Sequence, residues 1–311
     1  MKHLLEQLPN ELFLQIFAYF DLRNLQLTFW GLNSRLNTLL LSIPNISIDL
    51  ENSNDYSLIE QFARQISRLK ISLNQTIDLS EFTNIHFLEL CRPNDYQFDQ
   101  IRSDLLPNLF YLSITELNRI TFPKDVLEEI FSGRFRNLQE AKLPRLDSLP
   151  IHLNNTQCLS LRILDITCTN PNVICQIITI CPNLSKLSVT FFGSNRHILP
   201  PLGSAYNHNL GEFSLLDSYY CLTTETVEIL FLYMPNLKSL NLQTQCRTAV
   251  QNLFQTISNS FSSLEQFDCG ILEHRNNQMV DLISIQQIND SLFQCVQCLE
   301  KDNGSRLFFI E

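Results

Sequence analysis

The stretch MPNLKSLNLQ, residues 234–243, places Leu237, Leu240 and Leu242 in the frame L-x-x-L-x-L. Alternating apolar residues, as at Leu240 and Leu242, are typical of a β-strand with one buried face. The frame recurs along the chain, so it predicts a repeated unit. The clear further copies are Ile85-Leu88-Leu90, Leu109-Leu112-Ile114, Leu161-Leu164-Ile166 and Leu184-Leu187-Val189. Copies with a substituted position begin at Leu138, Leu210 and Leu264, and weaker ones at Ile43 and Ile66.

The spacing of these copies indicates what lies between them. Successive first positions are separated by 23, 19, 24, 29, 23, 23, 26, 27 and 27 residues. Most of these steps fall in the range of about 20–29 residues that is typical of repeats built from one strand and one helix. Helical patterns lie between copies at 126–131, 173–180 and 224–233. Because one such unit cannot bury its leucines alone, we expect the units to stack around a shared core.

Over roughly residues 43–270 the chain resembles the leucine-rich-repeat family. The resemblance implies an α/β solenoid of about nine or ten units, with a parallel sheet on the concave side and helices on the convex side. Two features depart from the family pattern. The Asn or Cys expected after the last leucine is replaced in most copies, for example by Thr169 and Phe192, and 193–209 is rich in Pro and Gly. The register predicts that Leu164, Leu187 and Leu240 are fully buried.

The first 42 residues show no repeat. LPNELFLQIFAYF, residues 8–20, predicts a helix that is apolar on nearly every side. Two further short helices are predicted from 22 to 41, separated near Trp30-Gly31, and Pro44 ends the run. A helix with so little polar surface needs cover from its own protein or from a partner. Its broad apolar stripe consists of Leu12, Phe13, Ile16, Phe17 and Phe20.

LPNELFLQIFAYFDLRNL, residues 8–25, resembles the start of the F-box motif. The resemblance implies a three-helix unit that docks onto a Skp-family adaptor and, through it, joins a cullin–RING ubiquitin ligase. A later position of the motif usually holds an aromatic residue, and this chain has Leu36 there. The residues that the resemblance assigns to adaptor binding are Leu8, Pro9, Leu12, Ile16, Phe17, Leu22 and Leu25.

The two resemblances predict three parts: an F-box-like helical domain at 1–42, leucine-rich repeats at 43–270 and a C-terminal cap at 271–311. They predict the substrate-recognition subunit of an SCF-type (Skp–cullin–F-box) E3 ubiquitin ligase, without catalytic residues of its own. The alternative is a leucine-rich-repeat interaction scaffold that is not assembled into a ligase. The protein substrate is expected on the concave strand face of the middle and later repeats, in contact with the loop at 193–209. The residues expected there are Lys186, Glu212, Asn241 and Asp268.

Composition excludes several other classes. The 311 residues carry 22 Lys and Arg against 32 Asp and Glu, so the net charge is −10, and no basic tract stands out. Nucleic acid and anionic membrane are therefore poor partners. No stretch approaches the roughly 18 apolar residues of a membrane span, and no secretory signal is recognisable. We expect a cytoplasmic or nuclear protein with reduced thiols. The sequence has no phosphate loop and no hydrolase motif, so no cofactor is predicted.

One pair of cysteines, Cys295 and Cys298, has C-x-x-C spacing. A structural zinc site would need two further ligands at suitable spacing. The nearest histidine is His274, and no second pair of cysteines accompanies it. The sequence therefore favours a C-terminal helix with two half-buried thiols, and no metal site is predicted.

Overall fold

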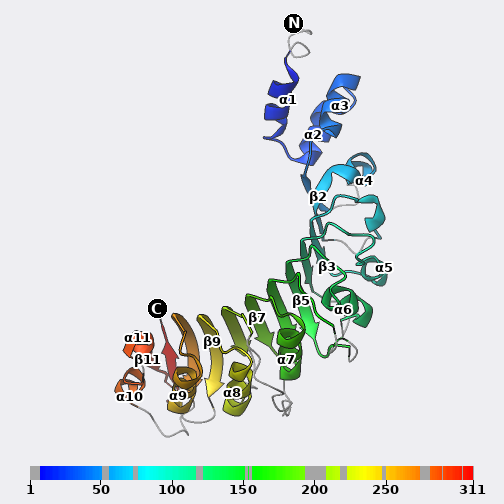
Figure 1. The fold of residues 1–311 in the computed structure, drawn as a ribbon. Helices are drawn as coiled ribbons and strands as arrows, with labels where there is room; N and C mark the ends of the chain where they lie inside the picture. The colour runs from blue at the N-terminus through cyan, green and yellow to red at the C-terminus, as the bar shows by residue number, and fades with distance from the viewer. Residues whose placement is uncertain are drawn as a thin grey trace. The chain divides into compact units, whose positions relative to one another are not determined.

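The computed structural model describes residues 8–50, 56–72, 76–116, 122–150, 153, 156–192, 208–217, 223–246, 250–273, 281–288, 290–302 and 304–310 (Figure 1). It is a mixed α/β structure whose strands are mostly parallel. Contacts divide the chain into two compact units, residues 1–120 and residues 121–311. These units differ from the three parts expected from the sequence, whose boundaries at 42 and 270 stay predictions.

Three short helices open the first unit, as the sequence predicts: α1 (Asn10–Phe17), α2 (Leu22–Phe29) and α3 (Ser34–Leu41). The carboxylate of Asp21 accepts a hydrogen bond from the Asn24 amide at 2.7 Å and so caps α2. Asn33 caps α3 in the same way. Between α2 and α3, Gly31 has a φ of +80°, in the left-handed region that favours glycine. Local chemistry therefore sets these helix boundaries.

Aromatic side chains hold the three helices together. Phe13 and Phe17 of α1 are buried, and the ring centroids of Phe17 and Phe29 lie 5.0 Å apart. Arg35 of α3 reaches the start of α1, where its guanidinium donates to the Asn10 side chain at 2.7 Å. The same guanidinium lies 5.5 Å from the centre of the Phe13 ring. The contacts of Phe13 and Phe17 thus bury one face of α1, and the other faces of the helix take no part in this core.

Four parallel strands follow in the first unit, and each carries one copy of the frame. Their order in the sheet is the chain order: β1 (Ile46–Leu50), β2 (Ile66–Ile71), β3 (Phe87–Cys91) and β4 (Tyr111–Thr115). Leu69, Leu88 and Leu112 lie side by side and are fully buried. The connections contain α4 (Tyr56–Phe62), 3-10 helices at Ala63–Gln65 and Leu79–Glu81, and α5 (Asp95–Asp99).

Replacing Asp21 with Ala should destabilise the first unit by about 1 kcal/mol, because the Asn24 amide loses its acceptor. The measurement is urea unfolding of the full chain followed by circular dichroism. Asp99→Ala is the matched control, since this exposed aspartate lies at the last residue of α5, where a carboxylate does not favour the helix. Equal destabilisation by the two variants would contradict the capping role.

The second unit continues the pattern with six parallel strands: β5 (Glu140–Leu146), β6 (Ile163–Cys168), β7 (Lys186–Phe191), β8 (Glu212–Asp217), β9 (Ser239–Cys246) and β10 (Gln266–Glu273). Its helices are α6 (Lys124–Phe131), α7 (Pro171–Ile180), α8 (Thr224–Leu232) and α9 (Val250–Ser260). They lie on one face of the sheet, where α7, α8 and α9 contact one another in turn (Figure 1). The helices predicted at 126–131, 173–180 and 224–233 are confirmed.

The strand register follows the predicted frame. Leu164, Leu187 and Leu240 each have 0% of their surface exposed, which confirms the prediction for these three positions. Phe213 and Phe267 occupy the equivalent positions of β8 and β10 and are buried beside them. Residues on either side of this row point to the opposite face, because side chains alternate along a strand.

The parallel order stops after β10. β12 (Arg306–Phe309) pairs with β10 in the antiparallel direction, and β11 (Gln297–Glu300) pairs with β12. Two short helices, α10 (Leu282–Gln286) and α11 (Asp290–Phe293), come before these strands. The helix predicted around Cys295 and Cys298 is wrong: Cys295 is exposed after α11, and Cys298 lies in β11 opposite Phe308. Pairing with β12, rather than local sequence preference, determines the structure there.

A buried ion pair joins β10 to the C-terminal strands. Glu273, the last residue of β10, has only 2% of its surface exposed. Its Oε2 atom accepts a hydrogen bond from Nε of Arg306 at 3.0 Å, and its Oε1 atom accepts one from the backbone amide of Val250 at 3.3 Å. One carboxylate thus connects the first residue of α9 with β12.

Candidate functional site

One side of α1 carries apolar side chains that the first unit leaves open to solvent. Leu12 and Tyr19 are 41% and 90% exposed, and Ile16 between them is half-buried. These three residues follow the i, i+4, i+7 spacing of a single helix face, continued by the turn after α1. We call them the α1 stripe. They border a hollow of about 480 Å³ that Leu8 and Ala18 also line.

A second hollow, of about 580 Å³, lies on another side of α1. Leu14 and Phe20, which are 40% and 39% exposed, line it together with Ile43 and Pro44 from the segment before β1. The described residues of the first unit therefore leave α1 exposed on two sides. Contiguous exposed apolar surface of this kind is typical of protein–protein interaction sites.

The residues that the F-box resemblance assigns to adaptor binding fall into two groups. Leu8, Pro9, Leu12 and Ile16 are exposed or half-buried, and Leu8, Leu12 and Ile16 line the first hollow. The other three residues are Phe17, Leu22 and Leu25. Their side chains are only 2–4% exposed, so they pack inside the unit, where they form part of the wall of the second hollow. Direct contact of all seven with a partner does not fit this burial.

Tyr19 is not among the residues that the F-box resemblance assigns to adaptor binding. The motif ends its pattern of apolar residues on α1 at Phe17, whereas Tyr19 lies just beyond the helix and is the most exposed of the large apolar side chains described. The spacing of seven residues between Leu12 and Tyr19 is the sequence signal that places Tyr19 in the α1 stripe. Leu36, which stands where the motif usually has an aromatic residue, is buried within α3.

The four residues predicted to bind a substrate lie on one face of the second unit, in two adjacent rows across the strands. Lys186 and Glu212 occupy the same row, and Asn241 and Asp268 occupy the next. Ser188 and Ser214 complete the second row toward β7. We call this surface the polar strand face.

Charged groups of the polar strand face are paired with their neighbours. Nζ of Lys186 lies 2.8 Å from Oε2 of Glu212, and both side chains are more than half exposed. The amide of Gln266 donates to Asp268 at 3.0 Å. Exposed pairs of this kind contribute little to stability, typically below about 1 kcal/mol, and can be exchanged for contacts to a ligand. The face therefore offers alternating donors and acceptors without a strong charge of one sign.

The loop that the sequence places beside this face, 193–209, lies outside the described residues except for its last two. Of these, His208 is buried, and its two ring nitrogens are both occupied. Nδ1 accepts from the Leu210 amide at 2.9 Å, so Nε2 carries the proton and donates to the Cys181 carbonyl at 2.8 Å. Burial lowers the pKa of His208, which favours this neutral form. The geometry gives His208 a structural role.

Most of the described thiols of the second unit are buried in its core. Burial raises the pKa of Cys168, Cys175, Cys246 and Cys269 to about 12, so these thiols stay protonated at neutral pH. A hydrogen bond from Cys181 lowers the pKa of Cys158 to about 6, although Cys158 is itself buried. Within the described ranges, no group of three His, Cys, Asp or Glu side chains could hold a metal ion. None of the described helices is long and apolar enough to span a bilayer.

No model of a known protein family matches this chain, and no curated protein matches it either.

Proposed function

We propose that this protein is the substrate-recognition subunit of an SCF-type E3 ubiquitin ligase. In this proposal α1–α3 form an F-box that binds a Skp-family adaptor, and β1–β10 with their helices form a leucine-rich-repeat solenoid that binds a protein substrate. The observation that carries the proposal is the α1 stripe, apolar side chains left open on a helix whose sequence resembles the F-box motif. The cytoplasm or nucleus, where such ligases act, is the proposed location.

The exposed side chains of the α1 stripe carry a free-energy cost in water. Burying a Leu or Ile side chain contributes about 1.5–3 kcal/mol relative to leaving it exposed. Leu12 is 41% exposed and Ile16 is half-buried, so part of this gain is left for a partner to supply. Because Phe13 and Phe17 already fix α1 to α2 and α3, the stripe is presented on a preorganised helix, and binding requires little further ordering.

The polar strand face is the proposed substrate surface. Stacked short strands form one wide surface to which several repeats contribute. The pairing of Lys186 with Glu212 means that a substrate replaces existing contacts rather than meeting bare charges. In the proposal the chain only binds, and the catalytic subunits of the ligase transfer ubiquitin.

The test is co-purification of a Skp-family adaptor with the full chain. Leu12→Ala/Ile16→Ala should weaken adaptor binding at least about thirtyfold, since a central interface residue is worth roughly 2 kcal/mol or more. Phe17 is left unchanged in this design because it is buried, and its truncation would destabilise the three helices themselves. The matched control is Leu216→Ala, a leucine with a similar exposed fraction, 39%, on β8 of the second unit.

Full adaptor binding by the double variant would contradict the role of the α1 stripe. Failure of the unaltered chain to bind any Skp-family adaptor would contradict the ligase proposal as a whole. That second result, together with capture of a protein through the polar strand face, would favour the interaction scaffold not assembled into a ligase.

A further inference from the structure

A second kind of site lies on the second unit, near the residues where β5 and β6 begin. It is a hollow of about 410 Å³ lined mainly by polar side chains, with no acidic residue among the described residues that line it. Two arginines, Arg136 and Arg162, border it, together with the amides of Gln139 and Gln157. We call it the arginine hollow. In a chain with a net charge of −10, two arginines in one such hollow need an explanation.

Both arginines are available to a ligand. Their side chains are exposed, and among the described residues neither forms an ion pair with a carboxylate. Arg162 uses one Nη1 donor on the carbonyl oxygen of Asn183 at 3.2 Å, which orients its guanidinium and leaves its other donors for a ligand.

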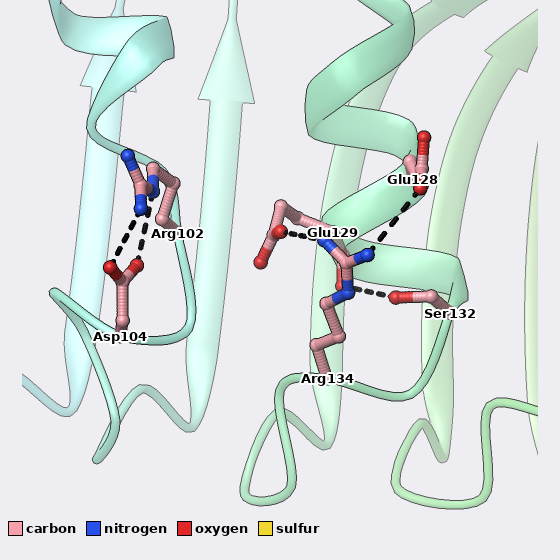
Figure 2. Close-up of polar contacts among 6 residues, drawn as sticks. All are labelled: Arg102, Asp104, Glu128, Glu129, Ser132 and Arg134. Atoms are coloured by element: carbon pink, nitrogen blue, oxygen red, sulfur yellow. Dashed lines mark hydrogen bonds and ion pairs between the residues drawn. The ribbon is translucent and has the colours of Figure 1, made fainter.

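Arg134, two residues before Arg136 in the same loop, is by contrast paired with two glutamates. Its guanidinium lies 2.5 Å from a carboxylate oxygen of Glu129 and 3.5 Å from one of Glu128 (Figure 2). Figure 2 also shows Arg102 of the first unit bound by Asp104, at 2.7 Å. Carboxylates thus pair with these two arginines, whereas none is found among the described residues that line the arginine hollow.

The backbone around the arginine hollow is closely packed. Gly133 has a φ of +77°, and a Cβ atom at this position would lie 2.8 Å from the carbonyl oxygen of Gln157. The hydroxyl of Ser160 donates to the carbonyl oxygen of Phe135 at 2.8 Å and ties the two loops together. The loops that carry the two arginines are therefore held against each other.

An equivalent hollow farther along the sheet lacks this character. It has a volume of about 530 Å³ and lies where β8, β9 and β10 begin. Its lysine, Lys238, is 3.4 Å from a carboxylate oxygen of Glu265, and Glu212 also lines it. Of these two hollows, only the arginine hollow has an excess of positive charge among its described lining residues, so the position at the start of the strands does not by itself produce that charge.

We propose that the arginine hollow binds a phosphate monoester. A guanidinium presents its N–H donors in a planar fork that matches two phosphate oxygens, and two forks can share one phosphate group. A phosphate monoester carries about −1.5 to −2 charges at pH 7, which balances the two arginines. The amides of Gln139 and Gln157 add neutral donors at the rim. This inference goes beyond the proposed function and needs no adaptor.

The test is an NMR titration of the full chain with its arginines labelled with ¹⁵N, using phosphoserine as the probe at constant ionic strength. The Nε–Hε signals of Arg136 and Arg162 should shift and saturate, and the signal of Arg134 should stay in place. Serine should cause no shift. A neutral peptide that contains phosphoserine forms a second arm: tighter binding than phosphoserine indicates a phosphorylated protein as the source, and equal binding indicates a small phosphorylated molecule.

Arg136→Gln/Arg162→Gln should weaken phosphoserine binding at least about tenfold, because hydrogen bonds between charged groups are the strong ones. The matched control is Arg102→Gln/Arg134→Gln, which removes the same charge from two arginines that already have carboxylate partners. Equal weakening by both double variants would show general charge attraction and overturn the proposal. The absence of a saturating shift in the unaltered chain would overturn it as well.

Discussion

Replacing Arg306 with Met should lower the free energy of unfolding of the second unit by about 3–5 kcal/mol. The substitution keeps much of the apolar stem of the side chain and removes the guanidinium that pairs with Glu273. Because Glu273 is 2% exposed, its carboxylate would remain buried with only the Val250 amide as a described donor. The measurement is urea unfolding at pH 7, followed by circular dichroism.

Two further variants test the reason for this loss. Glu273→Gln/Arg306→Met removes both charges and should recover part of the stability, since a buried pair exchanged for neutral groups costs far less than a pair that is broken. Lys238→Met breaks an exposed pair, whose side chains are 64% and 70% exposed, and should cost less than about 1 kcal/mol. A double variant as unstable as Arg306→Met alone would show that the buried charge is not the cause.

Leu187→Ala should cost about 2–5 kcal/mol, since it opens a cavity at a fully buried position in the middle of the stacked leucines. Leu216→Ala is the matched control on the neighbouring strand β8. Its side chain is 39% exposed, and the same substitution there should change the free energy of unfolding by no more than about 0.5 kcal/mol. Both values come from urea unfolding of the full chain. Similar losses at the two positions would mean that burial does not control the stability of these strands.

The strands of the repeated part were predictable because one signal specifies both their position and their buried face. The frame around Leu240 gives the start of β9, the side that faces the helices and the spacing to the next strand. Each of the ten copies found in the sequence lies on or directly before one of the strands β1 to β10. Short helices such as α2 were predictable for a similar reason, since capping residues and apolar periodicity act over a few residues.

The features that the sequence did not predict depend on contacts between residues that are far apart along the chain. β11 carries no frame, and it forms a strand because Cys298 meets Phe308 of β12. The motif that indicates an F-box names residue types but not their exposure, so it cannot tell that Phe17 supports α1 while Leu12 faces solvent. Arg136 and Arg162 come directly before and within different copies of the frame, and the parallel pairing of β5 with β6 brings them to one hollow.

The reversal of strand direction at β12 limits how far the sheet can grow. The last strand of a parallel array has a row of unpaired backbone N–H and C=O groups along its outer edge. A strand of another chain can pair with this edge. Here β12 occupies that edge of β10 in the opposite direction, and the final strand β11 has only four residues and ends in Glu300. Short, charged edges disfavour pairing with another chain. By covering the edge of β10, β11 and β12 thus disfavour the addition of a second molecule to the sheet at this end.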